Sequence, residues 1–227
     1  MRSAHWSLAI LLLTCFTAEA VAQPQPQWQA GVHYFLLPRA QPTNVPAGKV
    51  EVTEVFSYAC PACNQFNPAF EQIKAGLPAN VQVDYVHASF NPAEDWPMFQ
   101  RAFYAAQTLG IAEKTHVAMY DAIWKTGELS VVDKTTNQLR NPLPSIADAA
   151  DFYQRKAGIK KEDFLAAASS FGVDVKVKRA DALVIAYGAD STPTIIVNGK
   201  YRLSPSSAGG YNQLSALIKY LVAQETK

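Results

Sequence analysis

Cysteine is scarce in this chain of 227 residues, which has only Cys15, Cys60 and Cys63. Structural disulfides in secreted proteins normally close loops longer than the two residues between Cys60 and Cys63. The sequence therefore offers no framework of structural disulfides. Two cysteines separated by two residues are instead typical of a working redox pair.

Excess charge of one sign is also missing, since the formal net charge is +1. This balance excludes an electrostatic partner such as nucleic acid. A zinc site would need two ligands besides the cysteine pair, and His33, His87 and His116 are not spaced as a ligand pair. We therefore expect neither a metal nor another cofactor. About half of the residues are hydrophobic, which is enough for one sizeable core.

No apolar run is long enough to span a bilayer, which takes about 20 residues. The longest one near the start covers residues 8–16, follows Arg2, and precedes the small-residue stretch 18–22. This layout predicts a secretory signal peptide over residues 1–22, with cleavage after residue 20 or a retained anchor as alternatives. Cleavage would remove Cys15 and leave Cys60 and Cys63 as the only thiols.

The segment 23–95 reads as a β-α-β unit preceded by a Gln- and Pro-rich start. We expect strands over His33–Leu37, Val50–Phe56 and Val81–Val86, and a helix over Asn64–Gly76. A β-α-β unit predicts that the second and third strands are parallel.

The segment 96–187 has helical periodicity and reads as an insertion. We expect helices to end at three glycines, Gly110, Gly158 and Gly172. Ser145 and Asp148 resemble a capping box, whereas alternating Val173, Val175 and Val177 could also form a strand. Its large aromatic residues are expected in the core: Trp96, Phe99, Phe103 and Trp124.

The segment 188–227 returns to β character. Strands over Thr194–Val197 and Lys200–Leu203 are joined by Asn198-Gly199, a strong hairpin signal. A helix over 212–223 follows.

Cys60 falls at a junction between a strand and a helix. A catalytic cysteine must be an accessible thiolate, and the free N–H groups and positive dipole of a helix N-terminus stabilise an anion. Pro61 suits the first turn because it has no N–H to lose. Cys63 lies one turn later, so Cys60 would attack or be attacked and Cys63 would resolve the mixed disulfide. A structural disulfide or half of a zinc site remain as alternatives.

Thr192-Pro193-Thr194 is the second feature of interest. A proline before a strand marks the strand start or a turn, and most X-Pro bonds are trans.

Four features together resemble the DsbA family of periplasmic thiol-disulfide oxidoreductases. They are Glu54-Val55-Phe56-Ser57-Tyr58-Ala59-Cys60-Pro61-Ala62-Cys63, the helical insertion, Thr192-Pro193-Thr194, and Ile196-Val197-Asn198-Gly199-Lys200-Tyr201. The resemblance covers nearly the whole chain after the leader. It implies an α/β thioredoxin fold with a helical domain inserted between the β-α-β half and the C-terminal hairpin and helix.

The resemblance also implies roles for individual residues. Pro193 would be a cis-proline lying against the cysteine pair, and the Thr192 backbone would pair with an extended substrate peptide. Glu54 would be a buried acid that exchanges a proton with Cys63. A solvated carboxylate at a strand edge is the alternative for Glu54.

The implied function is to donate the Cys60–Cys63 disulfide to reduced or unfolded exported proteins in the periplasm. A membrane partner of the DsbB type would reoxidise the pair, and we expect a monomer. The alternatives are a periplasmic reductase or isomerase, and a non-catalytic peptide-binding chaperone.

Two positions depart from the family pattern. Ala62 stands where the best-studied oxidases have His, and Thr192 replaces a frequent Val. A His beside the attacking sulfur stabilises its thiolate, and Ala cannot. We expect Pro61, Ala62 and Glu54 to tune the redox pair, and Ala62 to make it a weaker oxidant than the DsbA whose potential is about −120 mV.

Overall fold

The computed structural model describes residues 27–226, so the predicted leader and Cys15 lie outside the described residues. The strands are β1 Phe35–Leu36, β2 Val50–Phe56, β3 Val81–His87, β4 Val132–Asp133, β5 Gln138–Leu139, β6 Thr194–Val197 and β7 Tyr201–Leu203. The helices are α1 Pro61–Ala75, η1 Pro92–Glu94, α2 Trp96–Thr108, α3 Ala112–Tyr120, η2 Asp121–Lys125, α4 Ile146–Ala157, α5 Lys161–Ala168, α6 Phe171–Ala186, α7 Pro205–Ala208 and α8 Tyr211–Glu225. None of these helices is long and apolar enough to cross a membrane.

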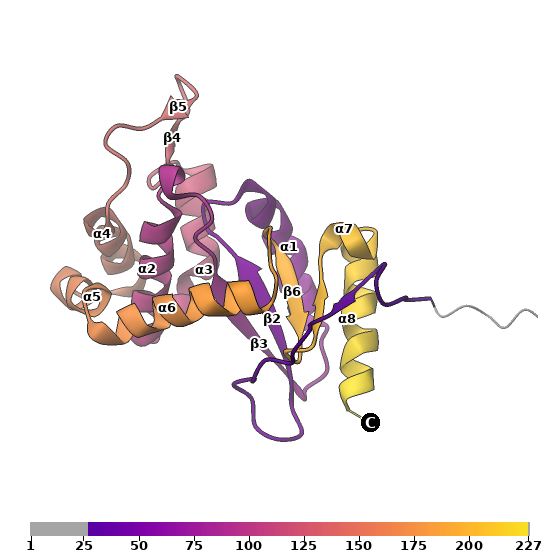
Figure 1. Ribbon diagram of the computed structural model, residues 1–227. Coiled ribbons are helices and arrows are strands. Elements are labelled where there is room, and N and C mark those ends of the chain that lie inside the picture. Colours follow the sequence, from indigo (N-terminus) through magenta and orange to yellow (C-terminus); the bar gives the residue numbers. More distant parts are fainter. Residues whose placement is uncertain (1–26, 227) are drawn as a thin grey trace, which may run out of the picture.

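The main sheet has five strands in the order β1-β7-β6-β2-β3. Strand β2 is parallel to β3 and antiparallel to β6, which confirms the expected β-α-β unit and places β2 inside the sheet. All seven residues of β2 are buried. Figure 1 shows the sheet in the middle of the molecule, with α8 on one side and the helices α2 to α5 on the other. The fold is the expected α/β arrangement with a helical insertion.

Two apolar cores cover the sheet. One joins Val50 and Val52 of β2 to buried residues of α1 and α8, such as Phe70 and Leu217. The other joins Val55 to the buried face of the helical insertion. Side chains alternate across a strand, and Val50 and Val52 face α1 and α8. Glu54 therefore shares this face with two valines.

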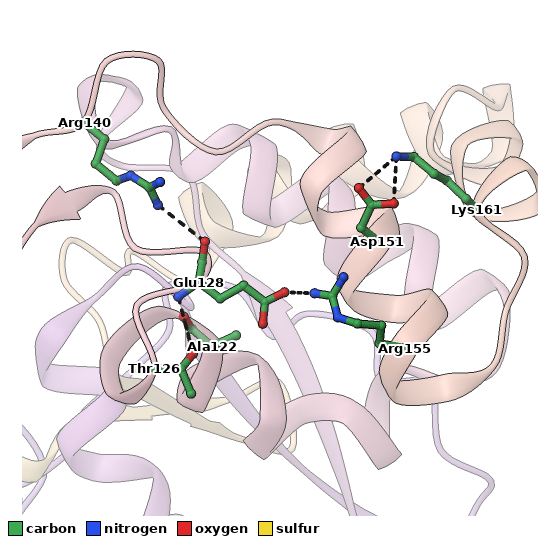
Figure 2. Close-up of polar contacts among 7 residues, drawn as sticks. All are labelled: Ala122, Thr126, Glu128, Arg140, Asp151, Arg155 and Lys161. Atoms are coloured by element: carbon green, nitrogen blue, oxygen red, sulfur yellow. Dashed lines mark hydrogen bonds and ion pairs between the residues drawn. The ribbon is translucent and has the colours of Figure 1, made fainter.

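The helical insertion contains a feature that the sequence did not predict. A two-stranded hairpin of β4 and β5 follows η2 and projects from the insertion (Figure 1). Figure 2 shows how Glu128, at the start of this segment, forms an ion pair with Arg155 of α4, while its backbone carbonyl accepts a hydrogen bond from the Arg140 guanidinium. Lys161 of α5 pairs with Asp151 of α4 at 2.7 Å in the same view. These contacts tie the hairpin and α5 to α4.

Several element boundaries differ from the sequence expectation. The first strand is limited to β1, and α1 already begins at Pro61. The alternating Val173, Val175 and Val177 lie in α6, where the buried Val173 packs against the insertion core while Val175 is exposed. Gly172 is inside α6 and ends no helix. By contrast, Ser145 and Asp148 form the expected capping box of α4, and Gly158 caps its end.

The turn between β6 and β7 confirms the hairpin signal. Asn198 and Gly199 have φ values of 51° and 62°, a left-handed conformation that Asn and Gly tolerate best. A Cβ on Gly199 would also collide with the backbone carbonyl of Gln41. Gln41 donates its own N–H to the Gly199 carbonyl at 2.8 Å, so the loop before β2 is anchored on this turn.

We expect Gly199→Ala to destabilise the protein more than Gly158→Ala does. Both glycines have positive φ, which costs about 1–2 kcal/mol for a residue with a Cβ. Only Gly199 adds a backbone collision, because nothing lies within 4 Å of a Cβ on Gly158. Urea unfolding of the two variants measures the difference, and equal losses would contradict the close approach to Gln41.

Candidate redox site

The cysteine pair lies at the N-terminus of α1. Strand β2 ends at Phe56, and a turn follows in which the Cys60 N–H donates to the Ser57 carbonyl at 3.2 Å. Pro61 then occupies the first helical position, so Cys60 is the N-cap of α1. Its Sγ accepts a hydrogen bond from the Cys63 backbone N–H at 3.4 Å. Cys60 Sγ thus takes the N-cap position that is occupied in many other helices by a side-chain oxygen of Asp or Ser.

The environment of Cys60 favours its thiolate. A hydrogen bond from the Cys63 thiol, further hydrogen bonds involving Thr192, and the Cys63 and Ala62 backbone N–H groups lower the pKa of Cys60 to about 6, against the opposing effect of burial. Both cysteines are free thiols in the structure. Cys60 is therefore largely ionised at neutral pH, as an exchange nucleophile or leaving group requires.

Cys63 has the opposite electrostatic environment. It is fully buried, and desolvation, the hydrogen bond it gives to Cys60, and the charge of Glu54 raise its pKa well above the ordinary value. Cys63 thus holds its proton at neutral pH. One helical turn therefore separates a charged thiolate at Cys60 from a neutral thiol at Cys63.

Glu54 lies beneath the pair on the β2 face that packs against α1. It is 1% exposed, which rules out the alternative of a solvated carboxylate at a strand edge. Burial, with smaller effects from the charges of Glu71 and Cys60, raises the pKa of Glu54 well above its usual range. Its carboxyl group is therefore a buried acid with a raised pKa in an otherwise apolar layer.

The segment around Pro193 is brought to the pair from the other half of the chain. The Thr192–Pro193 peptide bond is cis, and the Thr192 carbonyl oxygen lies 3.5 Å from Cys60 Sγ. Thr194 then begins β6, next to β2 in the sheet. The structure thus brings together Cys60, Cys63, Glu54 and Thr192-Pro193.

Pro61 and Ala62 are exposed between the two cysteines. Ala62 has no polar atom that could act on the thiolate. Within residues 27–226, no group of three or more His, Cys, Asp or Glu side chains could hold a metal ion. The chemistry that the site supports is exchange between sulfurs.

Sequence reasoning missed two residues that contact the turn before Cys60. His87 was considered only as a zinc ligand and Trp124 only as a core residue. Their side chains bind the Tyr58 backbone from positions 29 and 66 residues away. No local signal could have revealed contacts over such separations.

Comparison with known proteins agrees with this geometry. Residues 45–219 match the family model described as Thioredoxin. The chain is 35% identical over 195 residues to the thiol:disulfide interchange protein DsbA of Azotobacter vinelandii, covering 86% of this chain and 83% of the relative. It is similar to the crystal structure of DsbA from Xylella fastidiosa, with a TM-score of 0.73, 30% identity, and coverage of 85% and 95%.

A second structure shares the fold at 21% identity and a TM-score of 0.67, covering 87% of this chain and 100% of the other. It is a cysteine-to-serine variant of DsbA from Proteus mirabilis with the non-covalently bound peptide PWATCDS.

We expect Glu54→Gln to stabilise the reduced protein at pH 7 and to have less effect at pH 4. In the unfolded chain Glu54 ionises near 4.5, whereas burial delays its ionisation in the folded protein. The native state therefore loses stability relative to the unfolded state as pH rises above 4.5. Gln is neutral in both states and avoids this loss.

Urea unfolding at the two pH values measures the effect. The exposed Glu162 provides the control, because Glu162→Gln removes a carboxylate from the surface of α5. Equal changes at pH 4 and pH 7 for Glu54→Gln would contradict a buried acid with a raised pKa.

Proposed function

Because this chain belongs to the DsbA family, and is a thiol-disulfide oxidoreductase that introduces disulfide bonds into proteins, we propose that Cys60 and Cys63 carry the reaction. Cys60 is the sulfur that exchanges with the substrate, and Cys63 is the resolving sulfur. The observation that carries this proposal is the placement of Cys60 Sγ at the cap of α1, next to the Thr192 carbonyl.

The reaction begins with the oxidised pair. A substrate thiolate attacks Cys60 Sγ, a bond forms between these sulfurs, and the Cys60–Cys63 bond breaks. Cys63 leaves with the electron pair and takes a proton. A second substrate thiolate then attacks the substrate sulfur of the mixed disulfide, and Cys60 leaves as a thiolate. The substrate is oxidised by two electrons and the cysteine pair is reduced.

The two opposite pKa shifts suit these steps. A pKa of about 6 makes Cys60 a good leaving group at neutral pH. Cys63, whose pKa is raised, needs a proton when its bond to Cys60 breaks. We assign the protonated Glu54 as the source of that proton, and as its acceptor when the pair is reoxidised.

Thr192 and Pro193 form the binding element for substrate in this proposal. An extended peptide would pair with the Thr192 backbone as an added strand, which holds its cysteine beside Cys60. The peptide bound by the Proteus mirabilis protein supports a peptide ligand of this kind. Pro61 and Ala62, exposed between the cysteines, would face the same substrate.

The wider setting follows from the same family. We place the protein in the periplasm, exported by a signal peptide over residues 1–22, with reduced or unfolded exported proteins as substrates. A membrane protein of the DsbB type would reoxidise the pair, and the protein would act as a monomer without a cofactor. The thioredoxin-fold halves are residues 23–95 and 188–227, separated by the helical domain 96–187.

We expect Cys60→Ser to abolish oxidative refolding of a reduced substrate, because no sulfur remains to form the mixed disulfide. Cys63→Ala should instead accumulate covalent complexes with a substrate that carries a disulfide, because the Cys60 thiolate attacks that disulfide and Cys63 is no longer present to resolve the product. Refolding assays and non-reducing gels with mass spectrometry of the joined peptides measure both outcomes. Refolding activity that survives Cys60→Ser would favour the peptide-binding chaperone.

We expect a redox midpoint below the value of about −120 mV of a strongly oxidising DsbA, whose attacking cysteine has a pKa of about 3.5. Cys60 ionises near 6, so the reduced form of this protein gains less from its thiolate. Equilibration with glutathione buffers measures the midpoint, and thiolate absorbance measures the pKa.

Ala62→His is the matched variant, because it adds a side chain that can stabilise the thiolate. It should lower the pKa of Cys60 and raise the midpoint together. A midpoint of about −120 mV or higher in the parent protein would contradict the proposed weak oxidant. A midpoint in the range of thioredoxin, about −270 mV, would favour the reductase.

A further inference from the structure

Tyr58 lies two residues before Cys60, and side chains from distant elements hold its backbone. The Tyr58 N–H donates to His87 Nε2 at 3.2 Å, at the end of β3. The Tyr58 carbonyl accepts a hydrogen bond from Trp124 Nε1 at 2.8 Å, in η2 of the helical insertion. Tyr58 is 0% exposed. Both polar groups of its backbone therefore depend on these side chains for partners.

The hydrogen bond to His87 has a defined direction. His87 Nδ1 lies 2.8 Å from the Ala88 carbonyl, which can only accept, so Nδ1 carries the proton and Nε2 accepts. Burial keeps the ring neutral by lowering the pKa of His87 to about 3. The backbone N–H of Tyr58 is thus held by His87 at the end of β3.

The ring of Tyr58 is also fixed, by the helical insertion. Its hydroxyl lies 3.0 Å from His116 Nδ1 of α3, and its ring packs edge-on against Phe103 of α2 and Tyr120 of α3. The side chain of Tyr58 therefore cannot move without disturbing the insertion. The remaining freedom of the turn lies in the orientation of the peptide that carries the Tyr58 carbonyl.

That peptide is in the turn that delivers Cys60 to the cap of α1. The Cys60 N–H closes the turn on the Ser57 carbonyl at 3.2 Å, and Ala59 N–H donates to Ser57 Oγ at 3.3 Å. In the middle of this turn, the Tyr58 carbonyl accepts its hydrogen bond from Trp124 of the insertion. A rotation of the Tyr58–Ala59 peptide would change the direction of Cys60 relative to the Cys63 N–H.

We propose that Trp124 is a positioning residue for disulfide exchange: its indole N–H, bound to the Tyr58 carbonyl, holds the turn 57–60 so that Cys60 Sγ faces the N-terminus of α1. The inference rests on the proposed role of Cys60 as the exchanging sulfur. The insertion thus acts on the redox pair through the hydrogen bond from Trp124 to the Tyr58 backbone.

The hydrogen bond from Trp124 affects Cys60 in a way that packing of the Trp124 ring alone would not. Without the indole N–H, the buried Tyr58 carbonyl has no protein donor and turns toward another one or toward water. The Cys63 N–H then meets Cys60 Sγ at a poorer angle, and the thiolate loses part of a charge-assisted hydrogen bond. The reduced protein is the form that loses stability.

The test is Trp124→Phe, which keeps an aromatic ring and removes the N–H. The control is Trp96→Phe in the same insertion, where the lost indole N–H donates to Glu94 Oε2 at 3.1 Å, away from the cysteines. We expect the pKa of Cys60 to rise by about one unit in Trp124→Phe. The equilibrium constant with glutathione at pH 7 should then shift about fivefold toward a less oxidising pair, because ionisation of Cys60 would favour the reduced form by a factor of about 2 instead of about 11.

Thiolate absorbance and glutathione equilibration measure the two quantities on the folded variants. The proposal is overturned if Trp124→Phe has the pKa and equilibrium of the parent, or if Trp96→Phe shifts them equally. Either result leaves the proposed function intact, because that depends on the loss of activity in Cys60→Ser.

A second measurement needs no destabilising substitution. In the reduced parent protein, the indole ¹⁵N–H resonance of Trp124 should shift with pH, with a midpoint at the Cys60 pKa of about 6. Ionisation of Cys60 changes the turn 57–60 and therefore the Tyr58 carbonyl to which the indole N–H donates. The Trp96 resonance should not share that midpoint. A Trp124 resonance that is constant through the Cys60 titration would also overturn the proposal.

Discussion

The hydrogen bond between the Cys63 N–H and Cys60 Sγ is the contact on which the rest of the site depends. It exists because the turn that follows β2 places Cys60 at the cap of α1. The position of β2 inside the sheet then decides what else surrounds the sulfur. Its neighbour β6 begins at Thr194, and this pairing carries the Thr192 carbonyl to 3.5 Å from Cys60 Sγ.

The same turn of helix gives the two thiols opposite pKa shifts. Cys60 is mostly buried as well, at 5% exposed, so burial alone does not distinguish them. The difference is that Cys60 receives hydrogen bonds at the cap, whereas Cys63 gives one and lies above the buried Glu54. The two groups with raised pKa values, Cys63 and Glu54, therefore lie within the apolar layer, and the charge on Cys60 is at the helix cap.

The sequence was most informative where structure is local. The run Val50–Phe56 predicted the bounds of β2 because it alternates and contains β-branched residues, and Ser145 with Asp148 predicted the start of α4 because a capping box is complete within four residues. Asn198-Gly199 identified its turn for the same reason. Val173, Val175 and Val177 misled because tertiary packing of α6 overrides β-branched propensity.

The burial of Glu54 could be expected only through the family resemblance, and the contacts of His87 and Trp124 could not be expected at all. Glu54 is one polar residue in an alternating strand, and its surroundings are set by α1 packing over β2. Likewise, a tryptophan in a helical segment has the same local pattern whether it fills a core or reaches a neighbouring carbonyl. What separates these cases is the arrangement of the insertion on the sheet.

The helical insertion is for this reason part of the site and not an accessory to it. The thioredoxin-fold part supplies the strand, the helix N-terminus and the loop with Pro193, and its Phe56 and His87 contact part of the Tyr58 ring. The ring is covered by α2 and α3, and the carbonyl is bound by η2. Since Tyr58 belongs to the turn that positions Cys60, the geometry of the nucleophile is set jointly by both parts of the chain. A change in how the insertion packs would therefore alter the redox pair even if every residue from Cys60 to Cys63 stayed the same.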